Sequence, residues 1–543
     1  MISTAQVDNI LVDICAVFVL EDVRGGRTQF TDQEKSMLKP GRKLIQIMLV
    51  LAFIFSLSGS AAIQASTPST NLQPSLYAKA AVDPDQFVSV IVQKNASSGL
   101  LEAQVAHLGG VVTRDLHIIN AFSANLQAGK VLDLAKVPGA RWISLDAPVA
   151  TTASDEVDYV GESTLPPTFY LDTLKVRPVW EMGDRGQGIA VAEIDSGVAK
   201  VKDFQLDPTT GKPDSRVIER LSFNFKALAD GDLYGHGTHV AGIIGGNGYE
   251  SGYLYQGIAP GVNLISLRVN DDTGMAYESD IVAALQWVYD HKQAYNIRVV
   301  NLSMNSPVPS SYHTSPLSAA AEILWFNGVV VVVSAGNSSS DPAYNPINAA
   351  PAHDPFLITV GAVDEKGTAN REDDSVSNFS AAGTTIDGYS KPDIYAPGKD
   401  IISLIPKKSR WASEYPERMV GEDYFRLSGT SMAAPMVTGA VVLLLQNEPG
   451  LTPDQVKYRL INTAGALGSA RYLDVYAAIT GTTMESANTG VVASQLLWTG
   501  GDPITWNSVA WNSVAWNSVA WNSIAWNSVA WNSIAWNSVY WGR

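Results

Sequence analysis

The chain is almost free of cysteine, since Cys15 is the one thiol among 543 residues. A single thiol excludes an intrachain disulfide, a zinc site built from cysteines and an iron–sulfur cluster. Charged residues are also scarce, at 17%, and acids prevail, with 53 Asp and Glu against 37 Lys and Arg. The net charge of −16 repels nucleic acid and anionic membranes, so we expect neither as a partner.

Hydrophobic residues make up 46% of the chain, which is typical of a globular protein. Its length exceeds what one hydrophobic core supports, so we expect about two to four separately packed units.

An apolar run, Leu44–Leu57, follows the basic residues Lys39, Arg42 and Lys43 and precedes the small residues 58–62. This order is typical of a secretory signal peptide, which we expect at 37–62, and it predicts a secreted, extracellular protein. A membrane anchor is the alternative, but the run is shorter than the roughly 20 residues that span a bilayer. Because a signal peptide normally starts a chain, we expect translation to begin at Met37 and residues 1–36 to be a mis-assigned extension.

Residues 81–150 are predicted to form a small domain after a Ser/Thr/Pro-rich linker at 66–80. Helices are expected at 97–108 and 130–137. Strands are expected at 86–93, 111–116, 117–126 and 140–145. This β-α-β-β-α-β order predicts a split βαβ domain.

Strands and helices alternate through residues 165–482. Ile189–Ile194 and Leu264–Val269 are apolar runs, and Val329–Ala335 is too continuously apolar to be half exposed. A Ser315 cap, Pro316 and a closing Gly328 predict a helix between the strand expected at 298–303 and the strand at 329–335. The pattern predicts a doubly wound α/β domain with a mostly parallel sheet.

Three polar residues stand where strands end and helices begin. Asp195 follows the strand at 189–194, His236 lies in GHGTHVAG, and Ser431 lies in SGTSMAAP. Alone, such an Asp or Ser is usually a cap, and the His236/His239 pair could suggest a metal. No HExxH motif occurs, however, and we expect no catalytic metal. Together, a hydroxyl, an imidazole and a carboxylate at one sheet edge favour nucleophilic catalysis.

The motifs AEIDSGV, GHGTHVAG and GTSMAAP resemble the three active-site signatures of the subtilase family, in that family's order. SAGN at 334–337, GIAPGVNLISLRV at 257–269 and KPDIYAPG at 391–398 extend the resemblance over roughly 175–480. It implies a subtilisin-like fold and a secreted serine endopeptidase that acts on protein or peptide substrates. Residues 86–150 resemble the family's inhibitory propeptide, which implies a ferredoxin-like α+β domain and a zymogen.

The resemblance also assigns roles. Ser431 would attack the scissile carbonyl, His236 would take its proton, and Asp195 would hold the imidazole. Asn337 would form an oxyanion hole with the backbone N–H of Ser431. His239 is expected to be structural.

Ser303, Met304 and Asn305 match the family's strand that pairs with extended substrate. Asn305 and Ser306 stand where relatives usually have glycine, so we expect narrowed substrate pockets. No cofactor is expected for catalysis. Many relatives bind calcium, but no acidic loop could be matched to such a site, and structural calcium stays unassigned.

Seven pentads of the WNSVA type fill 506–540 of a terminal segment, 506–543, that follows an expected linker at 483–505. A period of five places successive Trp side chains on no single face of a helix or strand. Two interpretations stay open: attachment to a cell envelope or surface through Trp, and a flexible tail without fixed structure.

Three other functions agree less well with the sequence. A non-enzymatic surface protein could use a retired protease scaffold, but such a scaffold commonly loses active-site residues, and all four are present here. A peptide ligase would need to exclude water, and no additional domain suggests this. The sedolisin variant has acidic groups in place of the histidine and is disfavoured by His236 and Asn337.

Overall fold

The computed structural model describes residues 71–154, 157, 165–210, 215–227, 231–338 and 345–498. The expected signal peptide, the proposed start at Met37 and the Trp pentads lie outside these residues. Two units follow one another along the chain, divided after Pro68, and all the described residues belong to the second unit.

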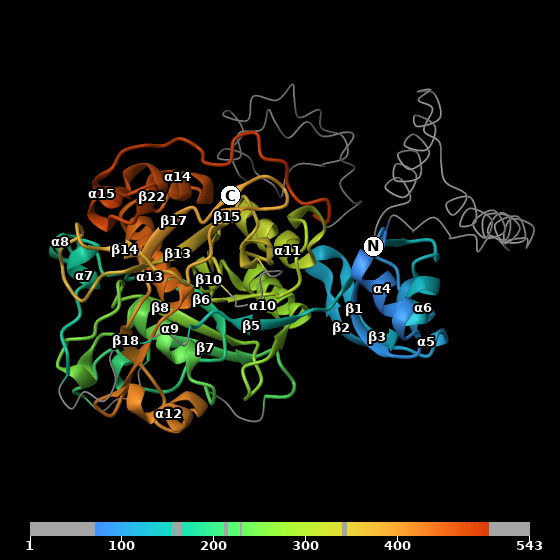
Figure 1. Cartoon of the computed structure of the whole chain (residues 1–543), viewed down its shortest axis with the longest axis horizontal. Helices are drawn as coiled ribbons and strands as arrows, with labels where there is room; N and C mark the ends of the chain where they lie inside the picture. Colours follow the sequence, from blue (N-terminus) through green and yellow to red (C-terminus); the bar gives the residue numbers. More distant parts are fainter. Residues whose placement is uncertain are drawn as a thin grey trace, which may run out of the picture. The chain divides into compact units, whose positions relative to one another are not determined.

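A mostly parallel sheet forms the centre of the larger part of the chain (Figure 1). Its strand order is β21-β22-β17-β13-β12-β10-β6-β8-β7, with β14 paired to β13. The strands are β6 (Ala190–Asp195), β7 (Val217–Ser222), β8 (Asn263–Arg268), β10 (Ile297–Leu302), β12 (Val330–Ser334), β13 (Ile358–Asp364), β14 (Ser375–Val376), β17 (Ile394–Pro397), β21 (Gly465–Leu467) and β22 (Ala470–Tyr472). Only the pairs β13–β14 and β21–β22 are antiparallel among these described strands.

Helices pack against the central sheet. They are α9 (His236–Gly245), α10 (Glu278–His291), α11 (Pro316–Phe326), α13 (Thr430–Asn447), α14 (Pro453–Thr463) and α15 (Val475–Thr480). Ser315 caps α11 through its side chain, as predicted from the Ser-Pro pair. All five residues of β12 are buried, which confirms the prediction from its run of valines.

One described helix, α13, is long and apolar enough to cross a membrane, but 89% of its apolar window is buried within the protein. Such burial is typical of a core helix, and α13 packs beside α9 and the central sheet strands.

Residues 71–145 form a second sheet with its own apolar core, here called the N-terminal sheet domain. Its strand order is β2-β3-β1-β4, and the neighbouring strands pair antiparallel. The elements are α4 (Pro74–Val82), β1 (Phe87–Lys94), α5 (Leu100–His107), β2 (Val111–Leu116), β3 (Ala121–Gln127), α6 (Ala128–Leu134) and β4 (Ala140–Leu145).

Two expectations for this domain were wrong. The linker predicted at 66–80 is helical from Pro74, because Leu76 and Ala80 pack into the domain core, so the domain begins before residue 81. The strand predicted over 117–126 starts only at Ala121. Residues 117–119 form a single 3₁₀ turn, which Asn120 ends with a positive φ of 49°.

Candidate active site

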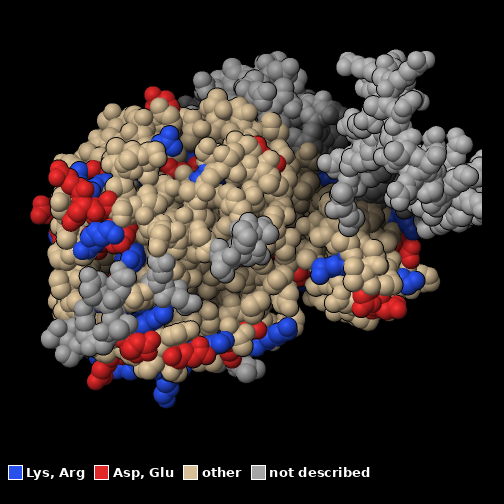
Figure 2. Space-filling model, in the orientation of Figure 1, with Lys and Arg blue, Asp and Glu red and all other residues tan. Residues whose placement is uncertain are grey.

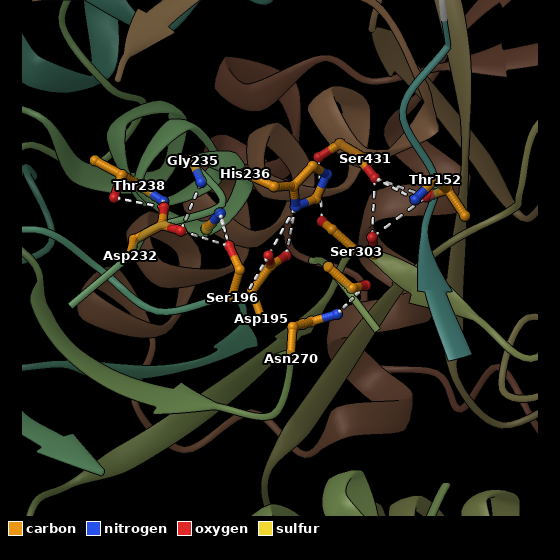
Figure 3. Close-up of polar contacts among 12 residues, drawn as sticks. Thr152, Asp195, Ser196, Asp232, Gly235, His236, Thr238, Asn270, Ser303 and Ser431 are labelled. Atoms are coloured by element: carbon orange, nitrogen blue, oxygen red, sulfur yellow. Dashed lines mark hydrogen bonds and ion pairs between the residues drawn. The ribbon is translucent and has the colours of Figure 1, made fainter. Parts of the chain in front are cut away.

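Asp195 and His236 form a buried pair at the edge of the central sheet (Figure 3). Asp195 is the last residue of β6, and His236 is the first residue of α9. His236 Nδ1 lies 2.8 Å from both carboxylate oxygens of Asp195. A carboxylate can only accept, so Nδ1 carries a proton, and in the neutral imidazole Nε2 then carries the lone pair. This is the tautomer that a general base needs.

Asp232 holds the start of α9 in place. Its Oδ1 accepts from Gly235 N at 2.7 Å and from Ser196 Oγ at 2.8 Å, and its Oδ2 accepts from Thr238 N at 2.8 Å. Ser196 Oγ in turn accepts from Gly237 N at 2.9 Å. The first turn of α9 is therefore tied to the residue that follows Asp195, which fixes the position of the imidazole.

Gly237 allows the start of α9 to approach the end of β6 closely. A Cβ at Gly237 would lie 2.3 Å from the carbonyl oxygen of Gly197, so α9 could not pack this near the end of β6 with any other residue.

Ser431 lies in the first turn of α13, where the N-terminal end of an 18-residue helix favours developing negative charge. The preceding Gly429 has a φ of 148°, and a Cβ there would meet the carbonyl oxygen of Thr152 at 2.5 Å. Gly429 thus leaves room for an extended segment of backbone beside Ser431.

The Ser431 hydroxyl does not bond His236 in this structure, contrary to the expected contact. Ser431 Oγ donates to Ser303 O at 2.9 Å, accepts from Thr152 N at 3.1 Å and lies 2.7 Å from Thr152 Oγ1 (Figure 3). His236 Nε2 is buried and has no hydrogen-bond partner among the described residues. The reason is that the hydroxyl donates its proton to the backbone carbonyl of Ser303, while Thr152 N donates to the hydroxyl oxygen.

Asn337 lies on the other side of Thr152. Its Nδ2 donates to Thr152 O at 2.8 Å, and Ser431 N donates to the same oxygen at 3.3 Å. Asn337 Oδ1 accepts from Thr430 N at 3.1 Å and Thr430 Oγ1 at 3.0 Å, which fixes the orientation of the amide. Two N–H donors therefore converge on one carbonyl oxygen, an arrangement suited to an oxyanion.

The segment that ends at Thr152 is bound as an added strand. β5 (Pro148–Thr151) pairs antiparallel with β11 (Met304–Asn305) on one side and with β9 (Ala276–Tyr277) on the other. Thr152 N also donates to Ser303 O at 3.3 Å. Ser303, Met304 and Asn305, expected to pair with extended substrate, thus pair here with residues 150–152. The resemblance to the family predicts a propeptide cut roughly between Ala150 and Thr164, a range that includes Thr152 but does not single it out.

A polar pocket receives the Thr152 side chain. Thr152 Oγ1 donates to Ser334 Oγ at 2.7 Å, and Asn305 Nδ2 donates to Ser334 O at 3.2 Å. Asn305 is buried and lies against Gly336, whose added Cβ would be 2.9 Å from Asn305 Nδ2. Asn305, where relatives usually have glycine, therefore places a side chain against Ser334 and Gly336, and the expected narrowing of the substrate pocket stays a prediction.

An aromatic wall lies beside the pair of Asp195 and His236. Trp411 of α12 (Arg410–Glu414) meets the His236 ring edge-on, with centroids 5.4 Å apart, and Tyr234 contacts Trp411 at 5.0 Å. These two rings, with Thr151 and Ala153, line a hollow of about 240 Å³. Acidic and basic side chains alternate along the edge of the molecule that carries α12 (Figure 2). Nothing in the sequence pointed to Trp411.

Two other titratable residues, His239 and Glu193, are buried near Asp195 and His236. Within the described residues, neither makes a contact like that between Asp195 and His236. His239 Nε2 donates to Phe425 O at 3.0 Å, and burial lowers the pKa of His239 to about 3, so it is a neutral structural residue. Burial, together with Asp195 and Asp232, raises the pKa of Glu193 well above its usual range. No group of three His, Cys, Asp or Glu side chains that could hold a metal occurs among the described residues.

Comparisons with known proteins agree on one family. The model of the subtilase family matches residues 186–491. Serine protease AprX of Bacillus subtilis is 36% identical over 51% of this chain and 61% of its own length. Subtilisin DY of Bacillus licheniformis is 32% identical over 55% of this chain and 92% of its own length.

A solved structure shares the fold. Fervidolysin from Fervidobacterium pennivorans, described as a keratinolytic enzyme related to subtilisin, superposes with a TM-score of 0.57 at 26% identity. The match covers 73% of this chain and 61% of fervidolysin. The family match spans more than half of the chain and includes all three strand-end motifs, and the chain therefore belongs to the subtilase family.

Proposed function

We propose that this chain is a secreted serine endopeptidase, made as a self-inhibited zymogen, with Asp195, His236 and Ser431 as its triad. One observation carries the proposal: the carbonyl oxygen of Thr152 lies between the Asn337 amide and the Ser431 N–H, while Ser431 Oγ bonds the same threonine. A backbone carbonyl held in this way is in the position of a bond about to be cleaved, or of one just cleaved.

The chemistry follows from these positions. Ser431 Oγ attacks the substrate carbonyl carbon as its proton passes to Nε2 of His236, and Asp195 stabilises the resulting imidazolium. Asn337 and Ser431 N–H bind the oxyanion. Collapse of the tetrahedral intermediate breaks the C–N bond, and the imidazolium returns its proton to the leaving amine. Water then hydrolyses the acyl-enzyme by the same steps, with His236 as the base.

The bond between Thr152 and Ala153 is the proposed site of self-cleavage. Thr152 would then be the P1 residue, the one that supplies the scissile carbonyl. Ser154 N donates to Ser428 O at 2.7 Å, so the chain is also held beyond the proposed scissile bond. The N-terminal sheet domain would be the inhibitor, with β5 as its tail in the cleft.

The contacts of Thr152 suggest a preference for small or hydroxylated P1 residues. Replacing Asn305 by Gly removes the side chain that lies against Gly336 and contacts Ser334. We expect Asn305→Gly to raise kcat/KM for peptides with Leu or Phe at P1 by about tenfold or more. The measurement is kcat/KM for a peptide series that differs only at P1. Alanine at P1 is the internal control and should change less than about threefold. Unchanged discrimination between Ala and Leu would contradict this assignment of the pocket.

Buried acids at the contact between the N-terminal sheet domain and α10 predict a pH dependence. Asp146 Oδ1 accepts from Ser279 N at 2.9 Å, and Arg114 donates to Asp280 at 2.7 Å. Burial raises the pKa of Glu278 to about 8 and that of Asp280 to about 7. Burial also raises the pKa of Asp146 above its usual value. Arg114 and the more distant Lys226 are the cations that oppose these shifts for Asp280.

An acid with a raised pKa binds its proton more tightly in the inhibited state than in the released state. Inhibition is therefore strongest below the ordinary carboxyl pKa of about 4.5 and weakens as pH rises through about 7 and 8. We expect release of the cleaved domain to be at least about tenfold faster at pH 8 than at pH 5. The release rate is measured at each pH by separating bound from free domain at successive times. Glu278→Gln should make this rate less dependent on pH. A profile that rises toward low pH would contradict this account.

Secretion is proposed from the apolar segment at 44–57 and from the likeness to subtilisins. Contact with a cell surface through the Trp pentads stays a proposal that rests on the sequence alone.

A fluorophosphonate probe tests the proposed activity directly. Purified mature protein should be labelled on the peptide that contains Ser431, and Ser431→Ala should not be labelled. A folded mature protein that stays unlabelled would overturn the proposal and favour a retired scaffold.

A further inference from the structure

Residues 488–498, here called the C-terminal arm, form no helix or strand, yet they are built into the fold. Ala493 and Ser494 are fully buried, and Leu496 and Leu497 are almost so. A linker was predicted over 483–505. This prediction was wrong for the arm, because its apolar side chains join the main hydrophobic cluster.

The arm is anchored to the catalytic part of the chain by its backbone and by the side chain of Asn488. Ser494 N donates to Glu322 Oε2 at 2.8 Å, and Gln495 N donates to His313 O at 2.9 Å. Asn488 Nδ2 donates to Phe356 O at 3.1 Å. These contacts fix the arm beside α11, which carries Glu322.

The opposite edge of the arm meets the N-terminal sheet domain. Gln93 donates to Leu496 O at 2.5 Å, and Arg141 donates to Leu497 O at 3.2 Å and to Gln495 O at 2.5 Å. Three consecutive carbonyl oxygens of the arm are thus taken by two side chains of that domain. Gln93 Nε2 also donates to Ile119 O at 2.8 Å, which keeps its amide aimed at the arm.

The side-chain pattern of β1 explains why this face is available. Val88, Val90 and Val92 belong to the domain's own core, whereas Ile91 belongs to the same hydrophobic cluster as Leu496 and Leu497. Because side chains alternate along a strand, Ile91 and Gln93 share the face that is turned away from the domain's own core. With the arm in place Gln93 is 1% exposed, and its Nε2 donates to Leu496 O of the arm as well as to Ile119 O.

We propose that the C-terminal arm is a second docking site for the N-terminal sheet domain, separate from the cleft, and that it retains the domain after the Thr152–Ala153 bond is cut. The retention rests on the proposed zymogen function, whereas the contact itself does not. By reciprocity, the bound domain also stabilises the arm, and its departure loosens residues 495–498.

The contact is tested first in the uncut chain that carries Ser431→Ala. Arg141→Met keeps the aliphatic stem but removes the donors, and we expect hydrogen exchange of residues 495–498 to become about tenfold faster or more. Lys136→Ala is the matched control, because Lys136 is exposed on the same domain and pairs only with Asp133 in the described structure. Exchange at 495–498 that does not respond to Arg141→Met would overturn the proposal, whether or not the chain is a protease.

Retention is tested in the self-cleaving chain by size-exclusion analysis of the cleaved domain over time. We expect Arg141→Met to release the domain about tenfold faster, and a chain that ends at Ser494 to do the same. A truncated chain that also carries Arg141→Met should release the domain no faster than the truncated chain alone. Truncated protein with wild-type thermal stability and wild-type release would overturn retention. A wild-type chain that never cuts itself would instead count against the proposed function, and the exchange experiment would still decide the contact.

Discussion

Ser431→Ala is expected to lower kcat on peptide substrates by about 10⁶, the size of the loss when the serine of the triad is removed in subtilisin. Among the described residues, the Ser431 hydroxyl is the one that accepts a hydrogen bond from Thr152 N. The backbone N–H of Ser431 donates to the carbonyl oxygen of Thr152. Without its oxygen no acyl-enzyme can form. The remaining rate should reflect the oxyanion donors and binding alone.

Purified Ser431→Ala and wild type should be compared on the same peptide at saturating concentration. Folding of the variant is checked by thermal unfolding, and we expect little change because only one oxygen is lost. A folded variant that keeps more than about a hundredth of the wild-type kcat would contradict the role of Ser431.

Asp195→Asn is expected to lower kcat by about 10⁴. His236 Nδ1 lies 2.8 Å from both Asp195 oxygens, so the carboxylate forces the proton onto Nδ1. An amide presents an N–H as well as an oxygen, and the wrong tautomer becomes available. Nε2 would then carry the proton and could not accept another from Ser431.

Glu193→Gln is the matched control. Glu193 lies two residues earlier on the same strand and the same face, is fully buried, and neither carboxylate oxygen has a hydrogen-bond partner among the described residues. Burial, Asp195 and Asp232 raise the pKa of Glu193 well above its usual range and so favour the uncharged acid, which glutamine matches in size and charge. We expect a change in kcat below about threefold. An equal loss in both variants would mean that the loss reflects damage to β6 and not the tautomer of His236.

Much of the fold was predictable because local patterns and packing agree. The valines of β12 and the Ser-Pro start of α11 mark buried strands and capped helices whatever surrounds them. The junction of Asp195 with His236 followed from their places at strand and helix ends. These features depend on short stretches of sequence or on the general rule that parallel strands end at one edge.

Other features depend on contacts between distant residues that no local pattern reveals. The Ser/Thr/Pro-rich stretch before residue 81 and the segment after α15 both resembled linkers. Each is held by apolar side chains that find partners far along the chain, as with Leu76 in its domain core and Leu496 in the main cluster. The state of Ser431 was missed for the same reason, since its hydroxyl is engaged by Thr152, 279 residues away.

We propose that Ser431 cuts the chain's own backbone. The most direct test is to express wild type and Ser431→Ala side by side and to identify their chain ends by mass spectrometry. A new N-terminus at Ala153 in wild type, and no cut near it in the variant, is the predicted result. The same new end in both proteins, or a wild-type cut far from the Thr152–Ala153 bond, would contradict it.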